Sequence, residues 1–394
     1  MTPHTPSVRH RGLLAVAACA SLTLGLAACG GGGLSEGSSG GGGGDAKGDI
    51  KLGMLTPLSG SSAAIGPYMK NGAQLAVDEI NAAGGVDGRK MTLTVEDDAC
   101  DPKTAAAGAA KLVTAGINIS VGGYCSSATL PTLSIFNKAT IPMLIPAANS
   151  ADLIKDKLPN VFLVNGTGIQ QAQAASDFIK SQGSKAVALL DDNTSYSKDI
   201  TTRTAEDLKA EGITVANQQS VTAGESDYSG AVTAVKRANA DFVYWTGYYQ
   251  EGGLLIKQLR SAGYDGKIMV ADGAVDKQLV QIAGQANAQG VYATMTQTPA
   301  TIPGGQEWIA KYKKAFNADP GPYSTQSYDA VRIAAEGVKR AGGSTDGAAV
   351  IKALEGINDV KIFSGTLKFT AEHTLSEGGF DILVVKGDDF VLNK

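Results

Sequence analysis

Short apolar runs separated by amphipathic stretches recur along most of the chain. The runs predict buried strands at residues 50–55, 91–95, 117–121, 141–145, 161–164, 186–190, 213–215, 241–245, 268–271 and 290–294. Helices are predicted between most of these strands, for example at residues 71–83, from residue 102 onward and at residues 130–139. Short apolar strands that alternate with crossover helices form parallel sheets covered on both faces, so the sequence predicts an α/β fold.

Several segments that directly follow predicted strands are rich in Gly, Ser, Tyr and Asp. They are residues 59–66, 122–129, 146–150, 191–196, 247–250 and 272–273. Ligands of parallel α/β sheets bind outside the carboxyl ends of the strands. Although most loops have a similar composition, these segments are where we expect a binding site for a small polar ligand.

The N-terminal segment has the organisation of an export signal. Arg9 and Arg11 precede an apolar stretch, residues 12–28, that has no charged residue and ends in small residues before Cys29. This pattern predicts a lipoprotein signal peptide at residues 1–28 and a lipid on Cys29. The alternative is an uncleaved membrane anchor, for which about 17 apolar residues are a marginal length.

Residues 29–48 are expected to form the lipidated cysteine and a flexible tether, since this segment is almost entirely Gly and Ser. The remaining chain is long enough for two lobes, and its location is expected to be extracytoplasmic, anchored by lipid to the bacterial cell membrane. The formal charge of −4 becomes about −6 without the leader. Mild acidity without basic clusters argues against nucleic acid as a partner.

Cys100 and Cys125 form an even pair in a chain expected to reach an oxidising compartment, and a disulfide is the simplest interpretation. Two free buried thiols are the alternative. A metal site is disfavoured because no His lies near the two cysteines.

The sequence contains no recognisable catalytic constellation. Only His373 remains after the leader, in a hydrophilic stretch where we expect a solvated loop residue. No G-x-S-x-G elbow, phosphate-binding loop or dinucleotide fingerprint occurs. We therefore expect a binding protein without a cofactor or metal, and not an enzyme.

Several motifs together resemble the leucine/isoleucine/valine-binding proteins of ABC importers, which have the type I periplasmic-binding-protein fold. The resemblance covers about residues 49–390 and depends on these segments in order: Asp97-Asp98-Ala99-Cys100-Asp101-Pro102, Gly123-Tyr124-Cys125-Ser126-Ser127, Pro146-Ala147-Ala148, Thr222-Ala223-Gly224-Glu225-Ser226-Asp227 and Asp241-Phe242-Val243-Tyr244. The combination of D-A-C-D-P with C-S-S is specific, whereas any one piece alone is weak.

The resemblance implies two Rossmann-like lobes with parallel central sheets, joined by a hinge of three crossings. The N-terminal lobe would comprise residues 49–167 and 296–374, and the C-terminal lobe residues 168–295 and 375–394. It also implies that Cys100 and Cys125 form the disulfide of the family, and that a small amino acid binds between the lobes. The partner would be the membrane permease of an ABC importer, and the protein would be a monomer.

The resemblance also assigns site residues in the N-terminal lobe. Ser126 would bind the ligand carboxylate, and backbone groups of Ala147, Ala148 and Asn149 would hold both charged ends. The family usually has Thr or Ser where this chain has Asn149, so the ammonium contact departs from the pattern. The side-chain pocket would include three residues, Ile65, Tyr124 and Tyr323.

In the C-terminal lobe, Tyr196 and Tyr248 match the tyrosines of the cleft, and Asp272 matches the acid that pairs with the ammonium. Branched-chain members often have Glu at that position, one methylene longer. Each residue also has a structural interpretation: Tyr196 and Tyr248 as surface aromatics, Asp272 as a turn former, Ser126 as a helix N-cap and Tyr323 as core. Trp245 and Trp308 are expected to be packing residues.

The sequence leaves several functions open. The first is transport of a neutral, branched-chain amino acid. A second keeps the fold but binds an aromatic or γ-amino acid, urea or a short amide, because Asn149, Asp272 and Tyr323 differ from the pattern. A third is a sensory or regulatory receptor domain.

Overall fold

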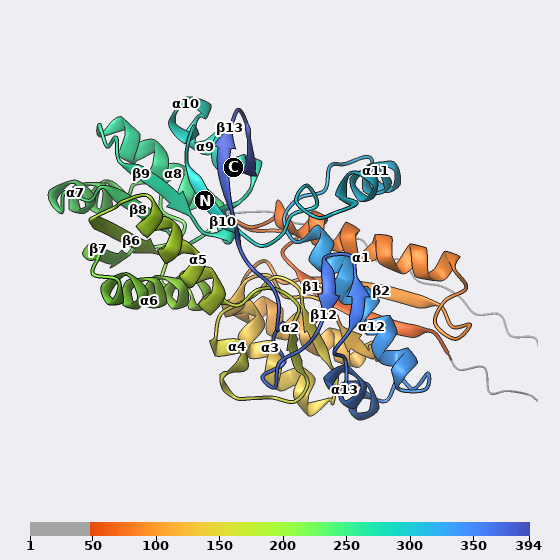
Figure 1. The fold of residues 1–394 in the computed structure, drawn as a ribbon. Helices are drawn as coiled ribbons and strands as arrows, with labels where there is room; N and C mark the ends of the chain where they lie inside the picture. Colours follow the sequence, from red (N-terminus) through yellow and green to blue (C-terminus); the bar gives the residue numbers. More distant parts are fainter. Residues whose placement is uncertain (1–47) are drawn as a thin grey trace, which may run out of the picture. The chain divides into compact units, whose positions relative to one another are not determined.

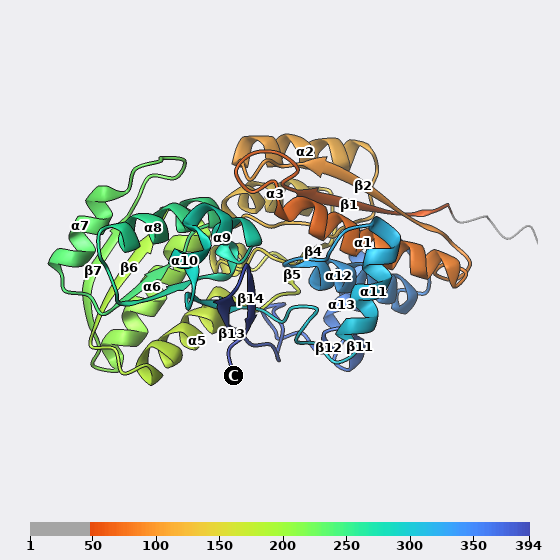
Figure 2. The same cartoon turned by 90° about the horizontal axis from the view of Figure 1, so that it is seen from above.

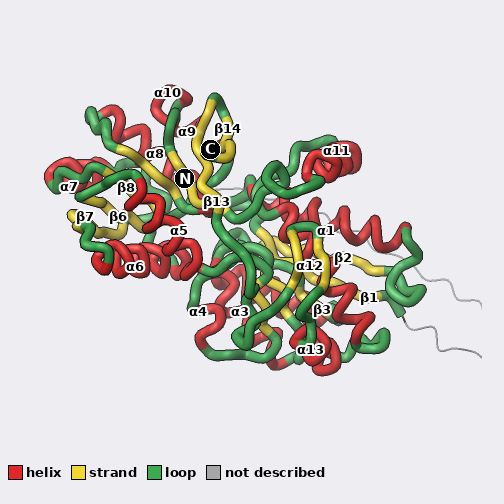
Figure 3. The backbone as a smooth tube through the Cα atoms, viewed as in Figure 1, coloured by secondary structure: helices red, strands yellow, loops and turns green. Residues whose placement is uncertain are grey.

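The computed structural model of the chain describes residues 48–394 (Figures 1 and 3). The predicted signal peptide, Cys29 and nearly all of the tether lie outside the described residues. Among residues 48–394, no helix has the length and apolar content needed to cross a membrane.

The first lobe is built on five parallel strands in the order β2-β1-β3-β4-β5. The strands are β1 (Ile50–Thr56), β2 (Met91–Asp97), β3 (Ile119–Ser120), β4 (Met143–Ile145) and β5 (Val161–Leu163). All five were predicted, and β3 is shorter than the apolar run that indicates it. Each strand is largely buried except β2 at the edge, as expected for a parallel sheet between helices.

Helices cover this sheet: α1 (Ile65–Ala82), α2 (Pro102–Thr114), α3 (Ser126–Lys138), α4 (Asp152–Lys155), α11 (Gly305–Phe316), α12 (Ser324–Arg340) and α13 (Gly347–Glu355). A hairpin of β11 (Val360–Ile362) and β12 (Gly365–Leu367) follows them. Helix α1 packs along α12. The two backbones approach so closely at Gly72 that an added Cβ would lie 2.0 Å from the Ser324 carbonyl oxygen, which explains the glycine.

The second lobe is built on seven strands in the order β14-β13-β10-β9-β8-β6-β7. These are β6 (Ala186–Asp191), β7 (Thr214–Ser220), β8 (Phe242–Trp245), β9 (Lys267–Val270), β10 (Tyr292–Met295), β13 (Asp381–Lys386) and β14 (Asp389–Leu392). Strands β6 to β10 are parallel, as predicted. Strands β13 and β14 form an antiparallel hairpin at the edge, which the pattern analysis missed.

The helices of this lobe are α5 (Gly168–Ser181), α6 (Ser195–Ala210), α7 (Ser229–Arg237), α8 (Tyr249–Ser261), the 3-10 turn η1 (Asp272–Ala274), α9 (Lys277–Ala283) and α10 (Gln285–Ala288). Helix α5 packs against α6, and α8 packs against α9. Trp245 is 1% exposed here, and Trp308 is 3% exposed in the first lobe, which confirms that both are packing residues.

The chain passes between the two sheets three times, at residues 164–167, 296–304 and 368–380 (Figure 2). The first passage follows β5, the second follows β10 and the third follows β12. The fold is therefore the two-lobed α/β architecture that the resemblance implied.

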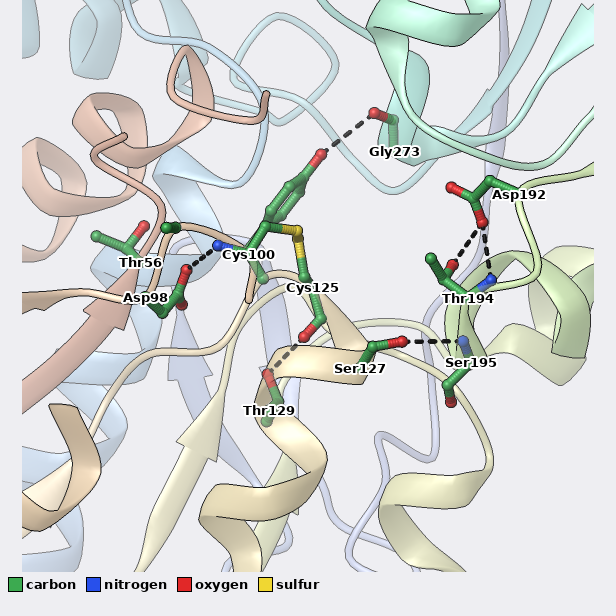
Figure 4. Close-up of a disulfide and its surroundings, with 12 residues drawn as sticks. Thr56, Asp98, Cys100, Cys125, Ser127, Thr129, Asp192, Thr194, Ser195 and Gly273 are labelled. Carbon is green, nitrogen blue, oxygen red and sulfur yellow. Dashed lines mark hydrogen bonds between the residues drawn. A yellow bond between two sulfur atoms is a disulfide. The ribbon is translucent and has the colours of Figure 1, made fainter. Parts of the chain in front are cut away.

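Cys100 and Cys125 form a disulfide, which confirms the predicted pairing, with Cα atoms 5.4 Å apart (Figure 4). It ties the loop after β2 to the residue that precedes α3. Ala99 and Cys100 have positive φ angles of 49° and 57°. The Asp97 and Asp98 carboxylates accept the N–H groups of Ala99 and Cys100, each at 2.8 Å, and so support this left-handed turn.

Removing the disulfide should destabilise the protein. The bond closes a loop of 25 residues, which corresponds to about 3–4 kcal/mol of lost chain entropy in the unfolded state. We expect the double variant Cys100→Ser, Cys125→Ser to lose about that much free energy of unfolding in urea titrations. Equal stability of the variant and the wild type would contradict this account.

Asp98 predicts a second, pH-dependent effect. Burial raises the pKa of its carboxyl from 3.8 to about 6, against the opposing hydrogen bond from Cys100. An acid with a raised native pKa binds more protons in the folded state, so the contribution of Asp98 to stability is fully present below about pH 4 and is lost as pH rises to about 6.

The Asp98→Asn variant should therefore lose about 2 kcal/mol less stability than the wild type between pH 4 and pH 7. Comparing urea unfolding of the two proteins at both pH values cancels the contribution of the other acids. Parallel pH profiles would show that Asp98 titrates with its ordinary pKa.

Candidate functional site

Asp272 stands at the centre of the candidate site. It follows β9, begins η1 and is 1% exposed. Its Oδ1 accepts hydrogen bonds from the Tyr196 hydroxyl and from Gln171 Nε2, the latter at 2.8 Å. Its Oδ2 is buried without a hydrogen-bond partner within the described chain. Asp272 therefore forms a turn, as one interpretation held, and also leaves one carboxylate oxygen available.

Four tyrosines gather around this carboxylate. The Tyr124 ring lies 5.7 Å from that of Tyr248 and 5.5 Å from that of Tyr323, and Tyr196 lies 5.4 Å from Tyr248. Tyr124 comes from the first lobe, and its hydroxyl donates to the Gly273 carbonyl of the second lobe at 3.2 Å. The structure thus places Tyr196 and Tyr248 side by side. Tyr196 is buried and Tyr248 is partly buried, so the interpretation as a surface aromatic is wrong for Tyr196.

Gly273 is required for this arrangement. A Cβ at this position would lie 2.9 Å from Tyr196 Cε1 and 3.1 Å from Tyr248 Cδ1. The Gly273 N–H also donates to the Tyr196 hydroxyl oxygen at 2.9 Å. Backbone and rings are therefore in direct contact, with no space for a side chain.

A buried amide chain connects the two lobes. Asn149 Nδ2, in the first lobe, donates to Gln171 Oε1 at 2.9 Å, and Gln171 Nε2 donates to Asp272 Oδ1 and to Thr294 Oγ1. Asn149 Oδ1 is buried without a partner, like Asp272 Oδ2. Gln171 was not among the predicted site residues. Its signal was a polar residue on the apolar face of α5, in line with Ala175 and Phe178.

Other expected contact groups are partly engaged within the protein. The Ala148 N–H donates to the Gly123 carbonyl at 3.1 Å, and the Ala147 carbonyl accepts from Asn165 Nδ2 at 2.9 Å. Ser126 Oγ accepts the Ser150 N–H at 3.3 Å. A carbonyl has two lone pairs and a hydroxyl has a donor as well, so Ala147 and Ser126 retain capacity for a ligand.

Ser126 is not the helix cap that one interpretation gave it. Helix α3 begins at Ser126 itself, and Cys125 occupies the capping position. The sequence predicted this helix only from residue 130. The helix begins earlier because Ala128 and Thr129 are buried inside the lobe, and this burial outweighs local propensity.

Ile65 and Tyr323 are both buried, at 1% and 2% exposure, and belong to one apolar cluster with Tyr124 and Ala147. Tyr323 precedes α12 with a φ of 61°. Both side chains are core residues and also neighbours of the tyrosine group. The interpretation of Tyr323 as core is therefore compatible with its expected position in the pocket.

Burial dominates the electrostatics of this group. It raises the pKa of Asp272, although the hydrogen bonds from Tyr196 and Gln171 act in the opposite direction. It raises the pKa of Tyr124, Tyr196, Tyr248 and Tyr323 well above the ordinary value of 10.0. The tyrosines are therefore neutral donors, and an ionised Asp272 requires a positive partner.

A second set of contacts joins the lobes at the first turn of α6. The Ser195 N–H donates to Ser127 Oγ at 3.0 Å (Figure 4), and the Ser195 hydroxyl lies 2.9 Å from both Ser150 Oγ and Asp152 Oδ2. Ser127, Ser150 and Ser195 lie in segments that follow predicted strands, but no role was predicted for them. They bind each other rather than a ligand, so they stabilise contact between the lobes directly.

His373 is not solvated as predicted. Its ring stacks on Phe162 at 4.2 Å, and its Nδ1 lies 3.1 Å from the Val161 carbonyl oxygen. The prediction failed because the contact joins residues far apart in sequence. Within residues 48–394, no group of three or more His, Cys, Asp or Glu side chains could hold a metal ion.

Comparisons with known proteins bear on this arrangement. The sequence model of the periplasmic binding protein family matches residues 49–389. The Leu/Ile/Val-binding protein homolog 3 of Brucella melitensis biotype 1 is 35% identical over 87% of this chain and 93% of that protein. The leucine-, isoleucine-, valine-, threonine- and alanine-binding protein of Pseudomonas aeruginosa is 32% identical over 84% of this chain and 89% of its own length.

Solved structures of binding proteins have the same fold as this chain. The substrate-binding protein LivJ of Streptococcus pneumoniae, in complex with isoleucine, superposes with a TM-score of 0.79 at 28% identity, covering 88% of this chain and 100% of that one. The leucine-binding protein LivK of Thermotoga maritima gives a TM-score of 0.81 at 23% identity over 88% and 98%, which supports the fold. These relatives are binding proteins, which confirms that the chain is not an enzyme. The chain belongs to the periplasmic binding protein family.

Proposed function

We propose that this protein captures a neutral amino acid, with a branched side chain preferred, between its two lobes and delivers it to the permease of an ABC importer. The observation that supports this most is the pair of buried oxygens without partners, Asp272 Oδ2 and Asn149 Oδ1. An ammonium group has three N–H donors and one positive charge, which suits a carboxylate and an amide oxygen together.

Gln171 gives this pair its geometry. It donates to Asp272 and accepts from Asn149, so one side chain orients both acceptors and leaves one oxygen of each unbonded. Asn149 would thus replace the hydroxyl of the family pattern by a carbonyl oxygen that serves the same ammonium.

The ligand carboxylate needs donors. The Ser126 hydroxyl and the Tyr248 hydroxyl are the proposed ones, with the backbone N–H of Asn149. No Lys or Arg occurs among the proposed contact residues, which disfavours a ligand with a second carboxylate, because burial of an unpaired ion is costly.

The ligand side chain is proposed to contact Ile65, Tyr124 and Tyr323. The relative from Pseudomonas aeruginosa is named for binding leucine, isoleucine, valine, threonine and alanine, and the relative from Brucella melitensis is named as a homologue of Leu/Ile/Val-binding proteins. Two tyrosines in the pocket add hydroxyl groups, and these are the observation that supports the second candidate, the same capture of an aromatic or γ-amino acid, urea or a short amide.

Capture would work by closure of the lobes. The ligand stabilises the closed form because only that form contacts its ammonium from Asp272 and Asn149 together. Without ligand, closure buries an acid with an unpaired oxygen, so the open form is favoured. A sensory receptor would use the same closure but would act on a regulatory partner instead of a permease.

The Asp272→Asn variant should lose amino-acid binding. We expect the affinity for leucine, measured by calorimetry on protein freed of ligand by unfolding and refolding, to fall about a hundredfold or more, because a neutral amide cannot compensate the ammonium charge. Each of the twenty amino acids is titrated in the same way.

Asp191→Asn is the matched control. Asp191 is also a buried acid at the end of a parallel strand of the second lobe, and its Oδ1 accepts only the Asn193 N–H, which an amide oxygen can also do. Its affinity should match the wild type. Binding of none of the twenty amino acids to the wild type, or unchanged affinity in Asp272→Asn, would refute the proposal.

We further propose that residues 1–28 are removed, that Cys29 receives the lipid and that the following Gly/Ser segment tethers the lobes near the permease. The Cys29→Ser variant should move from the detergent phase to the aqueous phase on Triton X-114 partitioning, and its N-terminal peptide should lack the acyl mass. Detergent-phase recovery of both proteins would instead indicate an uncleaved apolar anchor.

A further inference from the structure

A cavity of ≈ 180 Å³ lies at the hinge, away from the tyrosine group. We call it the hinge cavity. Residues from all three connections between the sheets line it, including Asn165 from the first, Thr296 and Gln297 from the second and Glu377 and Gly379 from the third. Any rotation of the lobes changes these connections, so the shape of the cavity depends on whether the lobes are open or closed.

The lining favours a positively charged ligand. Glu377 is the ionisable residue of the lining, and no Lys, Arg or His belongs to it. The Glu377 side chain is exposed to solvent. Asn165 is 1% exposed, and its Oδ1 is buried without a partner. The buried Asn165 Oδ1 is an acceptor that requires a donor, and the Glu377 carboxylate gives the lining a negative charge.

Asn165 also links the hinge cavity to the candidate site. Its Nδ2 donates at 2.9 Å to the carbonyl of Ala147, in the turn after β4 where ligand contacts are proposed. A molecule that binds Asn165 Oδ1 fixes the orientation of this amide, and thereby the hydrogen bond that holds the turn.

We propose that the hinge cavity is a second binding site, for a small organic ammonium ion, and that its occupancy tightens ligand capture by the lobes. An ammonium head would donate to Asn165 Oδ1 and pair with Glu377. The volume is below the range of about 300–1,000 Å³ of drug-sized sites, so the ligand has few heavy atoms. Because the cavity has this shape with the lobes in contact, its ligand stabilises that form.

The site is tested with n-propylammonium as the probe, and with propionate and n-propanol as its anionic and neutral counterparts. Saturation-transfer NMR on the full mature protein should show saturable binding of n-propylammonium and none of propionate. Binding should weaken several-fold in Glu377→Gln, because the charge is removed.

Gly379→Phe should block the cavity. An added Cβ at Gly379 meets no atom within 4 Å, so a large side chain is accommodated there without strain, at the edge of the cavity. Gly230→Phe is the matched control, since Gly230 is exposed on α7 with equally open space. We expect about a tenfold or larger loss of probe affinity in Gly379→Phe only.

Asp272→Asn separates the two sites, because a probe bound in the cleft would be lost there and one bound at the hinge would be kept. The absence of saturable binding, or equal binding in Gly379→Phe and Gly230→Phe, would overturn the second site.

The coupling to capture depends on the proposed function and is measured separately. Saturating n-propylammonium should lower the Kd of leucine about fivefold or more in the wild type and leave it unchanged in Gly379→Phe. Probe binding without a change in leucine affinity would overturn the coupling alone. Failure of leucine to bind, with probe binding intact, would count against the proposed function and not against the hinge site.

Discussion

The structure depends on one buried carboxylate. Asp272 is fully enclosed, yet only one of its two oxygens has hydrogen-bond partners in the described chain. A buried ion with unsatisfied capacity costs several kcal/mol, so the contact between the lobes is stable only when the acid is protonated or receives a cation. The Asp272 carboxylate therefore favours the open form when no ligand is bound. When a ligand ammonium pairs with it, the same carboxylate favours the closed form.

The folding pattern explains why this carboxylate sits where two lobes meet. Both sheets are parallel at their centres, so the loops at the carboxyl ends of the strands gather at one edge of each sheet. The turn after β4 supplies Asn149, the turn after β9 supplies Asp272, and the first turn of α5 contributes Gln171 between them. The disulfide fixes the loop beside Tyr124, and the absence of a side chain at Gly273 lets the rings reach the backbone.

Much of this could be predicted from sequence because the signals are local. Apolar runs separated by helical stripes indicated both parallel sheets, and the segments that follow strands contain Tyr196, Tyr248 and Asp272, which the structure brings together. The C-terminal hairpin was missed, although residues 382–385 form an apolar run and Gly387, with a φ of 70°, allows the turn.

The rest could not be predicted because it depends on contacts between distant residues. The Tyr124–Gly273 bond joins residues separated by 149 positions, and the Gln171–Asp272 bond spans 101. Nothing in the sequence around Gln171, Ser195 or His373 indicates these partners. The start of α3 was predicted too late in the chain, because burial of its first turn outweighs local helix propensity. Family resemblance supplied Ser126 and Asn149 as candidates, but only the structure shows which of their atoms are already bonded.

The most direct test is a crystal structure of the protein with leucine bound. We expect the ligand nitrogen within hydrogen-bond distance, about 2.7–3.2 Å, of both Asp272 Oδ2 and Asn149 Oδ1, with the bond from Gln171 to Asp272 intact. A ligand nitrogen that contacts neither oxygen, or leucine bound outside the tyrosine group, would contradict this expectation.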